Sequence, residues 1–203
     1  MPKLIRSALP QGEIRLGIKL MNTVFDDDFQ LRTIRTLIEE GEVRPDYLIY
    51  ANRLYNQAHP DSAKGGAAYG GPDLSRRNLR LLSRLRRLEL EGELSAPVPG
   101  ISGTGDVHSG KMALEYALRG AESLQMHTLF QLPSSAYGMT VGSKTERALH
   151  ELYFHPRNGL VTWMLHLRET GGIGQAGGDR FFSRSDLLVP GAGTRFLREG
   201  AHE

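Results

Sequence analysis

The sequence predicts an α/β fold, in which four strands alternate with helices along the chain. Apolar runs of strand length recur at residues 14–21, 47–50, 98–102 and 123–129, and a segment with a helical period follows each run. Strands that are separated by helices pair in parallel through right-handed crossovers. Two architectures satisfy this pattern: an open sheet of four parallel strands, or four consecutive units of an eight-stranded β/α barrel. The length of 203 residues is enough for one sizeable core.

The first unit combines a strand over residues 14–21 (IRLGIKLM) with a helix over residues 26–40. The strand is apolar around one lysine and is expected to be buried. Acidic residues crowd the first turn of the helix and Gly41 follows its end, as is typical of helix boundaries. An apolar stripe on this helix predicts that it packs on the sheet; its members are Phe29, Ile34, Leu37 and Ile38.

The second unit contains a short strand, YLIY at residues 47–50, and a helix over residues 74–90 that is rich in leucine and arginine. The loop between them, residues 58–72, is Gly-rich, and its length is typical of a lid or a binding loop. The leucines of the helix form a core stripe, so its arginines are expected to lie on a solvated face.

The third unit carries a Gly-rich turn between a strand at residues 98–102 and a helix over residues 109–119 that ends at Gly120. A strand, a Gly-rich turn and a helix N-terminus together can form a phosphate cradle, because free backbone N–H groups and the helix dipole both favour an anion. The alternative is an ordinary strand-to-helix turn that needs glycine for its tight geometry.

The fourth unit begins with a strand over residues 123–129 that carries polar residues toward its end, and helices are predicted over residues 145–154 and 160–169. A Gly-rich loop after the third of four strands suits the second half of a barrel, where a phosphate site often follows the seventh and eighth strands. Residues 14–170 are therefore predicted to form a partial β/α barrel. Residues 171–203, rich in Gly, Arg and Ser, are expected to be a flexible C-terminal extension.

Composition excludes several classes of function. The formal net charge is only +2, too small to indicate nucleic-acid binding. No apolar run has the length of a membrane span, and the N-terminus lacks a signal-peptide pattern. The chain has no cysteine, which fits a reducing cytoplasm and excludes thiolate-held clusters and a cysteine base within it. The histidines show no metal-ligand spacing, so no metal site is predicted.

The turn of the third unit resembles the flavin phosphate signature of the dihydroorotate dehydrogenases and their dihydropyrimidine dehydrogenase relatives. The matching pattern is Gly103-x-Gly105-x-Val107-x-Ser109, followed by Ala113 and by Gly120-Ala121. Asp106 departs from the pattern, because the family usually has glycine there. Two further segments occur in the order that the family shows: a strand with Lys19 (GIKL), and a strand ending in Asn52 (DYLIYAN).

The resemblance implies an FMN-dependent oxidoreductase of pyrimidine biosynthesis that oxidises dihydroorotate to orotate. It implies that Lys19 touches the flavin ring and that Asn52 contacts the small pyrimidine substrate. The FMN phosphate would be held by two turns, whose residues are Gly103, Thr104 and Gly105, and His127 and Thr128.

The resemblance covers only the second half of such a barrel. Residues 1–13 cannot supply four further strands, so the chain is expected to be a fragment or to be completed by another polypeptide. The serine or cysteine base of the family would lie in the other half, and no catalytic residue is predicted here. The alternative is a non-catalytic half-barrel that binds a phosphorylated ligand or a partner subunit, or self-associates through its open edges.

Overall fold

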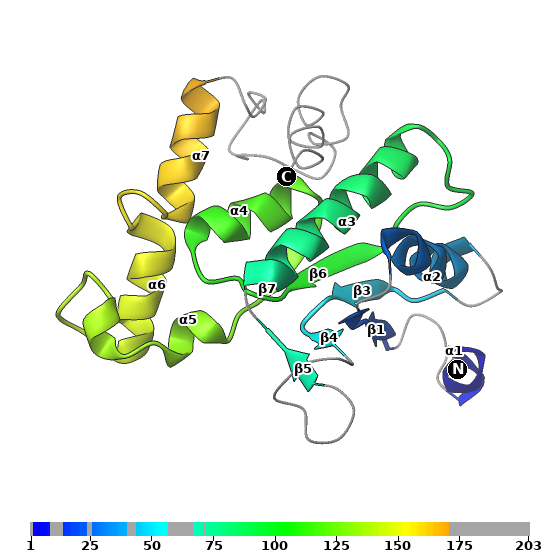
Figure 1. Ribbon diagram of the computed structural model, residues 1–203, viewed down its shortest axis with the longest axis horizontal. Coiled ribbons are helices and arrows are strands. Elements are labelled where there is room, and N and C mark those ends of the chain that lie inside the picture. Colours follow the sequence, from blue (N-terminus) through cyan, green and yellow to red (C-terminus); the bar gives the residue numbers. More distant parts are fainter. Residues whose placement is uncertain are drawn as a thin grey trace.

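Four parallel strands form the main sheet of this computed structural model, which describes residues 2–8, 14–23, 26–39, 44–56, 67–70 and 72–170 (Figure 1). The strands lie in the order β1-β3-β6-β7, and every neighbouring pair is parallel. Their order in space follows their order in the chain, without the reversal that places helices on both faces of a doubly wound sheet. The predicted α/β fold with four parallel strands is confirmed, and it is compatible with half of a β/α barrel. The strand bounds are Gly17–Lys19 (β1), Tyr47–Tyr50 (β3), Gly100–Thr104 (β6) and Ala121–Gln125 (β7).

One hydrophobic core lies between this sheet and three of its helices. Leu48 on β3 is 1% exposed, and its register partners Ile18 and Ile101 belong to the same core. The helices α2 (Asp27–Glu39), α3 (Pro72–Leu90) and α4 (Gly110–Leu118) all contribute to that core, so they cover the same face of the sheet. Their buried apolar residues in the core are Leu31, Ile34 and Ile38 of α2, Leu81, Leu82 and Leu85 of α3, and Ala113 and Tyr116 of α4.

The opposite face of the sheet is polar. Because side chains alternate along a strand, residues in register point to the same side. Lys19, Ile49, Ser102 and Ser123 are register partners across all four strands, and they form one row on the face away from the three helices. Lysine and serine at the edges of this row give it little apolar surface.

A second, small sheet was not predicted from the sequence. It joins β2 (Asn22–Thr23), β4 (Leu54–Asn56) and β5 (Ala67–Tyr69), with β2 parallel to β4 and β4 antiparallel to β5. The predicted loop at residues 58–72 therefore contains a strand, while residues 57–66 lie outside the described part. The predicted strand at 14–21 is correspondingly shorter, because the chain leaves the main sheet after Lys19 and joins the small one at Asn22.

The prediction of a strand over residues 123–129 is wrong in its second half. Strand β7 ends at Gln125, and a short helix, α5 (Thr128–Gln131), follows. Met126, Leu129 and Phe130 all pack on the core, and their i, i+3, i+4 spacing suits a helix rather than a strand. The Tyr137 hydroxyl also donates a 2.6 Å hydrogen bond to the carbonyl of Leu129.

Two further helices, α6 (Lys144–Phe154) and α7 (Leu160–Glu169), flank the sheet beyond β7 (Figure 1). They pack on each other and on α4, and they agree with the predicted helices. A 3₁₀ turn spans Ser134–Ala136, and a helix not predicted from the sequence, α1, spans Pro2–Ala8. The predicted extension at residues 171–203 lies outside the described residues. Within the described part, no helix is both long and apolar enough to cross a membrane.

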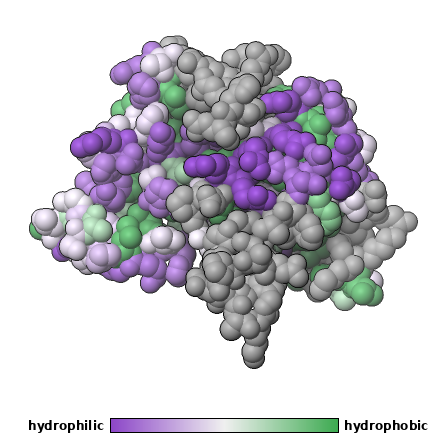
Figure 2. All heavy atoms as spheres, viewed as in Figure 1, coloured by the Kyte–Doolittle hydropathy of each residue, from purple (hydrophilic) through white to green (hydrophobic). Residues whose placement is uncertain are grey.

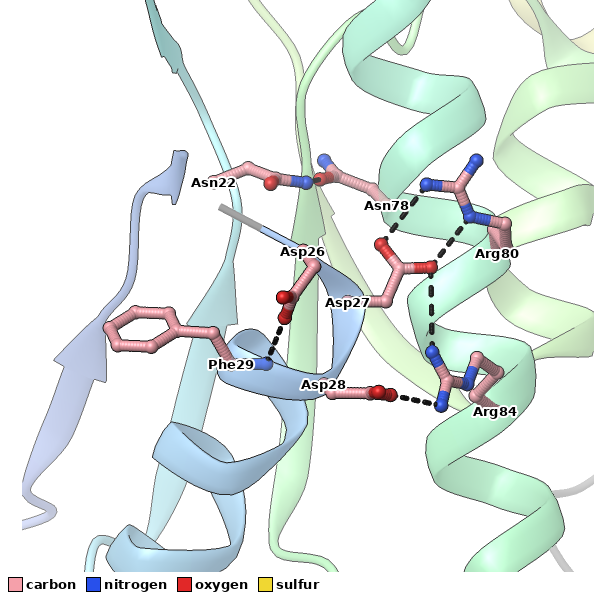
Figure 3. Close-up of polar contacts among 8 residues, drawn as sticks. All are labelled: Asn22, Asp26, Asp27, Asp28, Phe29, Asn78, Arg80 and Arg84. Carbon is pink, nitrogen blue, oxygen red and sulfur yellow. Dashed lines mark hydrogen bonds and ion pairs between the residues drawn. The ribbon is translucent and has the colours of Figure 1, made fainter. Parts of the chain in front are cut away.

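The first turn of α2 is bound to α3 by ion pairs. Arg80 donates two hydrogen bonds to the Asp27 carboxylate, at 2.7 and 3.0 Å, and Arg84 reaches Asp28 at 2.5 Å (Figure 3). The Asp26 carboxylate accepts a hydrogen bond from the backbone N–H of Phe29 and so caps the helix. These contacts fix the orientation of α2 relative to α3. The apolar pattern of either helix alone does not specify that orientation.

The arginines of α3 do not form only a solvated face. The surface over α3 is strongly hydrophilic (Figure 2), but Arg86 is 3% exposed. Its guanidinium donates to the carbonyls of Arg119 and Gly120, each at 3.0 Å, and pairs with Glu89 at 2.6 Å. The prediction is therefore wrong for Arg86, which satisfies carbonyl groups at the end of α4.

The contact between Asp27 and Arg80 should make the free energy of unfolding depend on pH in the acid range. The hydrogen bond from Arg80 holds the pKa of Asp27 below its ordinary value. A carboxyl whose pKa is lower in the folded state stabilises the fold above its unfolded pKa of about 4, and this stabilisation is lost as the pH falls through the folded pKa. We expect Asp27→Asn to lower the free energy of unfolding by about 1 kcal/mol at pH 7, with a smaller effect near pH 3.

Urea denaturation followed by circular dichroism across this pH range would measure the difference. Glu91→Gln is a matched control, because Glu91 is an exposed acid just beyond the end of α3. An Asp27→Asn variant whose stability follows the same pH profile as the unchanged protein would contradict the assignment.

Candidate functional site

A cavity of about 720 Å³ lies at the carboxyl edge of the main sheet. Parallel strands bring their carboxyl ends to one edge, which is where open α/β sheets and barrels place their ligands. The ends of β1, β6 and β7 and the segment that follows β3 all contribute residues to the wall of this cavity. The lining residues are Lys19, Asn52, Arg53, Gly70, Thr104, Gly105, Asp106, Val107, Gln125, Met126, His127 and Thr128.

The structure brings together six of the seven residues that the sequence predicts for a site. Lys19 comes from the end of β1, Asn52 follows β3, Thr104 and Gly105 lie at the end of β6, and His127 and Thr128 follow β7. These residues are separated by up to about a hundred positions in the chain, and parallel pairing alone makes them neighbours.

Gly103 is the exception. It does not line the cavity, because its position faces the helix layer: a Cβ atom there would lie 2.7 Å from Cδ1 of Tyr116. Tyr116 is fully buried on α4. Glycine at this position therefore lets α4 pack closely on β6, which explains Gly103 without any ligand.

Gly105 is required by the backbone of the turn. Its φ angle is +104°, and a Cβ atom would lie 2.4 Å from the carbonyl oxygen of Ala51. A side chain at this position would be strained by conformation and by contact at once. The two interpretations of the Gly-rich turn left open by the sequence are thus compatible: the turn has tight geometry, and its backbone also lines the cavity.

The N-terminus of α4 is not open to the cavity in the way that a phosphate cradle requires. Its N-cap Ser109 accepts a hydrogen bond from the N–H of Met112, and the N–H of Lys111 donates to the carbonyl of Asn158 at 2.8 Å. A Cβ atom on Gly110 would lie 2.0 Å from the backbone nitrogen of Leu160. The connection between α6 and α7 therefore covers this helix end, and the predicted cradle is reduced to the turn that precedes it.

Asp106, which departs from the family pattern, has its carboxylate turned toward α3 and His108. One carboxylate oxygen accepts a 2.9 Å hydrogen bond from the Ser75 hydroxyl, and the other lies 3.2 Å from Nδ1 of His108. The Asp106 side chain is only 9% exposed. Both oxygens of its carboxylate therefore already have contacts within the protein.

Two cations of the cavity, in contrast, have no acidic partner in the described part of the chain. Lys19 and Arg53 are both exposed, and neither forms an ion pair with any acid among the described residues. Many other arginines in the described part are paired, as Arg80, Arg84 and Arg86 show. Exposed cations with no ion-pair partner among the described residues make this cavity suited to an anionic ligand.

Arg53 was missed in the sequence analysis. It directly follows Asn52, so its position after a predicted strand was the one signal that could have identified it. Within the described part, no group of three or more histidine, aspartate or glutamate side chains is arranged to hold a metal ion.

The chain matches no known family of proteins when it is compared with family models, and the comparison with curated proteins finds no similar sequence. Fold and site together define an α/β protein with a polar, cation-bearing cavity at the carboxyl edge of a four-stranded parallel sheet.

Two glycines of the cavity wall provide a direct test of this geometry. We expect Gly105→Ala to lower the free energy of unfolding by about 1–3 kcal/mol in the absence of any ligand, because of the positive φ and the contact with Ala51. Gly70→Ala is the matched control, since a Cβ at Gly70 meets nothing within 4 Å. Thermal or urea unfolding measures both, and equal stability of the two variants would contradict the account of Gly105.

Proposed function

We propose that this chain is the FMN-binding part of a flavin-dependent oxidoreductase of the dihydroorotate dehydrogenase type, with a small pyrimidine as substrate. The observation that carries the proposal is a cavity at the carboxyl ends of the four parallel strands. It collects Lys19, Asn52, the turn at residues 104–106 and the turn at residues 125–128. The resemblance in sequence assigns a flavin or substrate contact to each of these segments.

The residues of the cavity fit FMN in size and charge. A volume of about 720 Å³ lies within the range of about 300–1,000 Å³ for small-molecule and cofactor sites. The phosphate of FMN is anionic, and His127 and the turn at residues 104–107 line one end of the cavity, while the cations Lys19 and Arg53 line the other end. Asp106, the one acid among the described lining residues, contacts Ser75 and His108. Since the amides of Lys111 and Met112 at the start of α4 already have partners, the proposal relies on the turns at residues 104–107 and 125–128 for the phosphate.

Strand order divides the cavity into two regions. The turns after β6 and β7 are adjacent, and we assign the phosphate to them. The ends of β1 and β3 are adjacent on the other side, where Lys19, Asn52 and Arg53 lie. Neighbouring strands are about 4.8 Å apart, so the two edge strands of four are separated by roughly 14 Å. An extended cofactor can therefore contact both regions at once.

Lys19 and Asn52, near the ends of β1 and β3, have distinct roles in this proposal. When bound, FMN supplies the acceptor for a hydride. The ammonium of Lys19 stabilises negative charge that develops on the flavin ring. Asn52 both donates and accepts hydrogen bonds, which suits the imide edge of a pyrimidine. The proposal assigns proton abstraction to no residue of the cavity.

A titration of FMN with the purified chain tests the proposal. We expect the flavin fluorescence to change saturably and the bound flavin to remain with the protein on gel filtration. Dye reduction with dihydroorotate, alone and with a lysate fraction that could supply a completing polypeptide, tests turnover. A chain that leaves FMN fluorescence unchanged at concentrations well above those of the flavin would refute the assignment.

Lys19→Ala should make bound FMN harder to reduce, because it removes a positive charge near the ring. We expect the midpoint potential to become more negative by about 30 mV, which corresponds to about 1.4 kcal/mol for a two-electron couple. Lys144→Ala is the control, since it removes the same charge from the first turn of α6, away from the cavity. Equal potentials in both variants would show that Lys19 does not act on the flavin.

Asn52→Ala should affect the substrate and not the cofactor. We expect its affinity for FMN to stay within about twofold and its affinity for orotate to fall about tenfold, since about 1.4 kcal/mol of hydrogen bonding is lost. Perturbation of the flavin absorption spectrum by orotate measures the second quantity. Unchanged binding of orotate would remove Asn52 from the substrate site.

One observation favours the second candidate, a non-catalytic half-barrel that binds a partner. Within the described residues, β1 and β7 each have a neighbour on one side only, so both edges can accept another strand. Sedimentation velocity distinguishes the candidates when it is combined with the FMN titration. A stable dimer that binds no flavin supports the half-barrel, and a flavin-binding monomer excludes it.

A further inference from the structure

Asn78 on α3 is a buried polar residue that lies beneath the cavity and is not part of its wall. Its side chain is 0% exposed. Its Nδ2 atom donates to the carbonyl of Ala51 at 2.8 Å and to the carbonyl of Thr104 at 2.9 Å. Its Oδ1 atom accepts a 2.8 Å hydrogen bond from the buried amide of Asn22 on β2 (Figure 3). Asn78 thus connects the ends of β3 and β6 with β2.

This set of partners is specific to an asparagine amide. Two carbonyl oxygens require two N–H donors on one side, and the Asn22 amide requires an acceptor on the other. A carboxylate would place an oxygen against both carbonyls, and an apolar residue would remove the Asn78 donor from both, leaving the Thr104 carbonyl only the Tyr116 hydroxyl at 3.1 Å. Glutamine would carry the same amide one methylene farther from the helix.

The carbonyls of Ala51 and Thr104 both lie directly before residues of the cavity wall. Ala51 directly precedes Asn52, and Thr104 directly precedes Gly105, so each carbonyl belongs to the peptide group that leads into a residue of the cavity wall. Asn78 Nδ2 also lies 2.9 Å from the position that a Cβ of Gly105 would occupy. The amide therefore fills the space that glycine leaves open.

Tyr116 on α4 extends the same contact. It is fully buried, and its hydroxyl donates to the carbonyl of Gly105 at 2.8 Å. The Tyr116 hydroxyl also lies 3.1 Å from Nδ2 of Asn78. Side chains from α3 and α4 thus hold three successive parts of the wall from below: the end of β3, the end of β6 and the turn after it.

We infer that Asn78, supported by Tyr116, is a positioning residue that sets the geometry of the cavity. It holds the ends of β3 and β6 at a fixed separation, so that Asn52 and the turn at residues 104–106 face the same ligand. The inference takes the identity of that ligand from the proposed function, but the contacts themselves require no ligand.

The other end of α3 provides a matched control. Ser83 is a buried hydroxyl on the same helix, and it accepts a 2.7 Å hydrogen bond from Arg119, near the amino end of β7. Ser83→Ala and Tyr116→Phe each remove one buried hydroxyl without removing the side chain that packs. Asn78→Ala removes the whole amide, so it should perturb the cavity wall more. Tyr116→Phe removes only a hydroxyl and should perturb the fold less.

Amide hydrogen exchange measured on the full chain without ligand tests the positioning role. We expect exchange at Asn52, Arg53 and residues 105–107 to be at least about tenfold faster in Asn78→Ala and Tyr116→Phe than in the unchanged protein, because local opening exposes these amides. Exchange in α6 and α7 should not change. In Ser83→Ala we expect no change at the cavity wall.

Titration with FMN then connects the geometry to binding. We expect Tyr116→Phe to bind FMN about tenfold more weakly than Ser83→Ala, while both have similar unfolding midpoints. Faster exchange confined to the cavity wall supports the inference, whether or not FMN binds. Failure of the unchanged protein to bind FMN refutes only the proposed function. Exchange that rises evenly over the whole chain, or not at all at the wall, overturns the inference whether or not FMN binds.

Discussion

The register of the main sheet determines most of what this molecule can do. Lys19, Ile49, Ser102 and Ser123 lie in one row, so the row one residue farther along, Tyr50, Gly103 and Leu124, must face the helices. A shift by one residue in any pairing would exchange the two faces. The same pairing brings four strand ends to one edge, where the cavity forms. Core, polar face and site are therefore three results of one set of backbone hydrogen bonds.

Those parts of the fold that have a strong local period could be predicted from the sequence. Helices α2, α3, α4, α6 and α7 and strand β3 lie within a residue or two of their predicted bounds, because each carries its own apolar pattern. The sheet of β2, β4 and β5 could not be predicted, since strands of two or three residues leave no period to detect. After β7, the helical spacing of Met126, Leu129 and Phe130 spans too short a run to be distinguished from a strand by its period, and packing on the core stabilises the helix.

The candidate site likewise has features that could be predicted from the sequence and features that depend on contacts between distant residues. Lys19, Asn52 and the two turns could be placed together because parallel strands always bring their carboxyl ends together. The separate roles of Gly103 and Gly105 could not, since they depend on Tyr116 and on the carbonyl of Ala51, which are distant in the sequence. Asn78 gave no signal at all, because an asparagine inside a leucine-rich helix has the same pattern whether it is solvated or buried between two strand ends.

The covered N-terminus of α4 has a consequence for how an anion could be held. Amides at a helix end are fixed and partly shielded from solvent, whereas Lys19 and Arg53 are exposed side chains in contact with water. Mobile ions screen exposed charges over a Debye length of about 8 Å at physiological ionic strength, and over about 3 Å at 1 M. Negative charge held by these two side chains would therefore be bound more strongly in dilute buffer than at high salt, so the ionic strength would affect how tightly this end of the cavity holds a ligand.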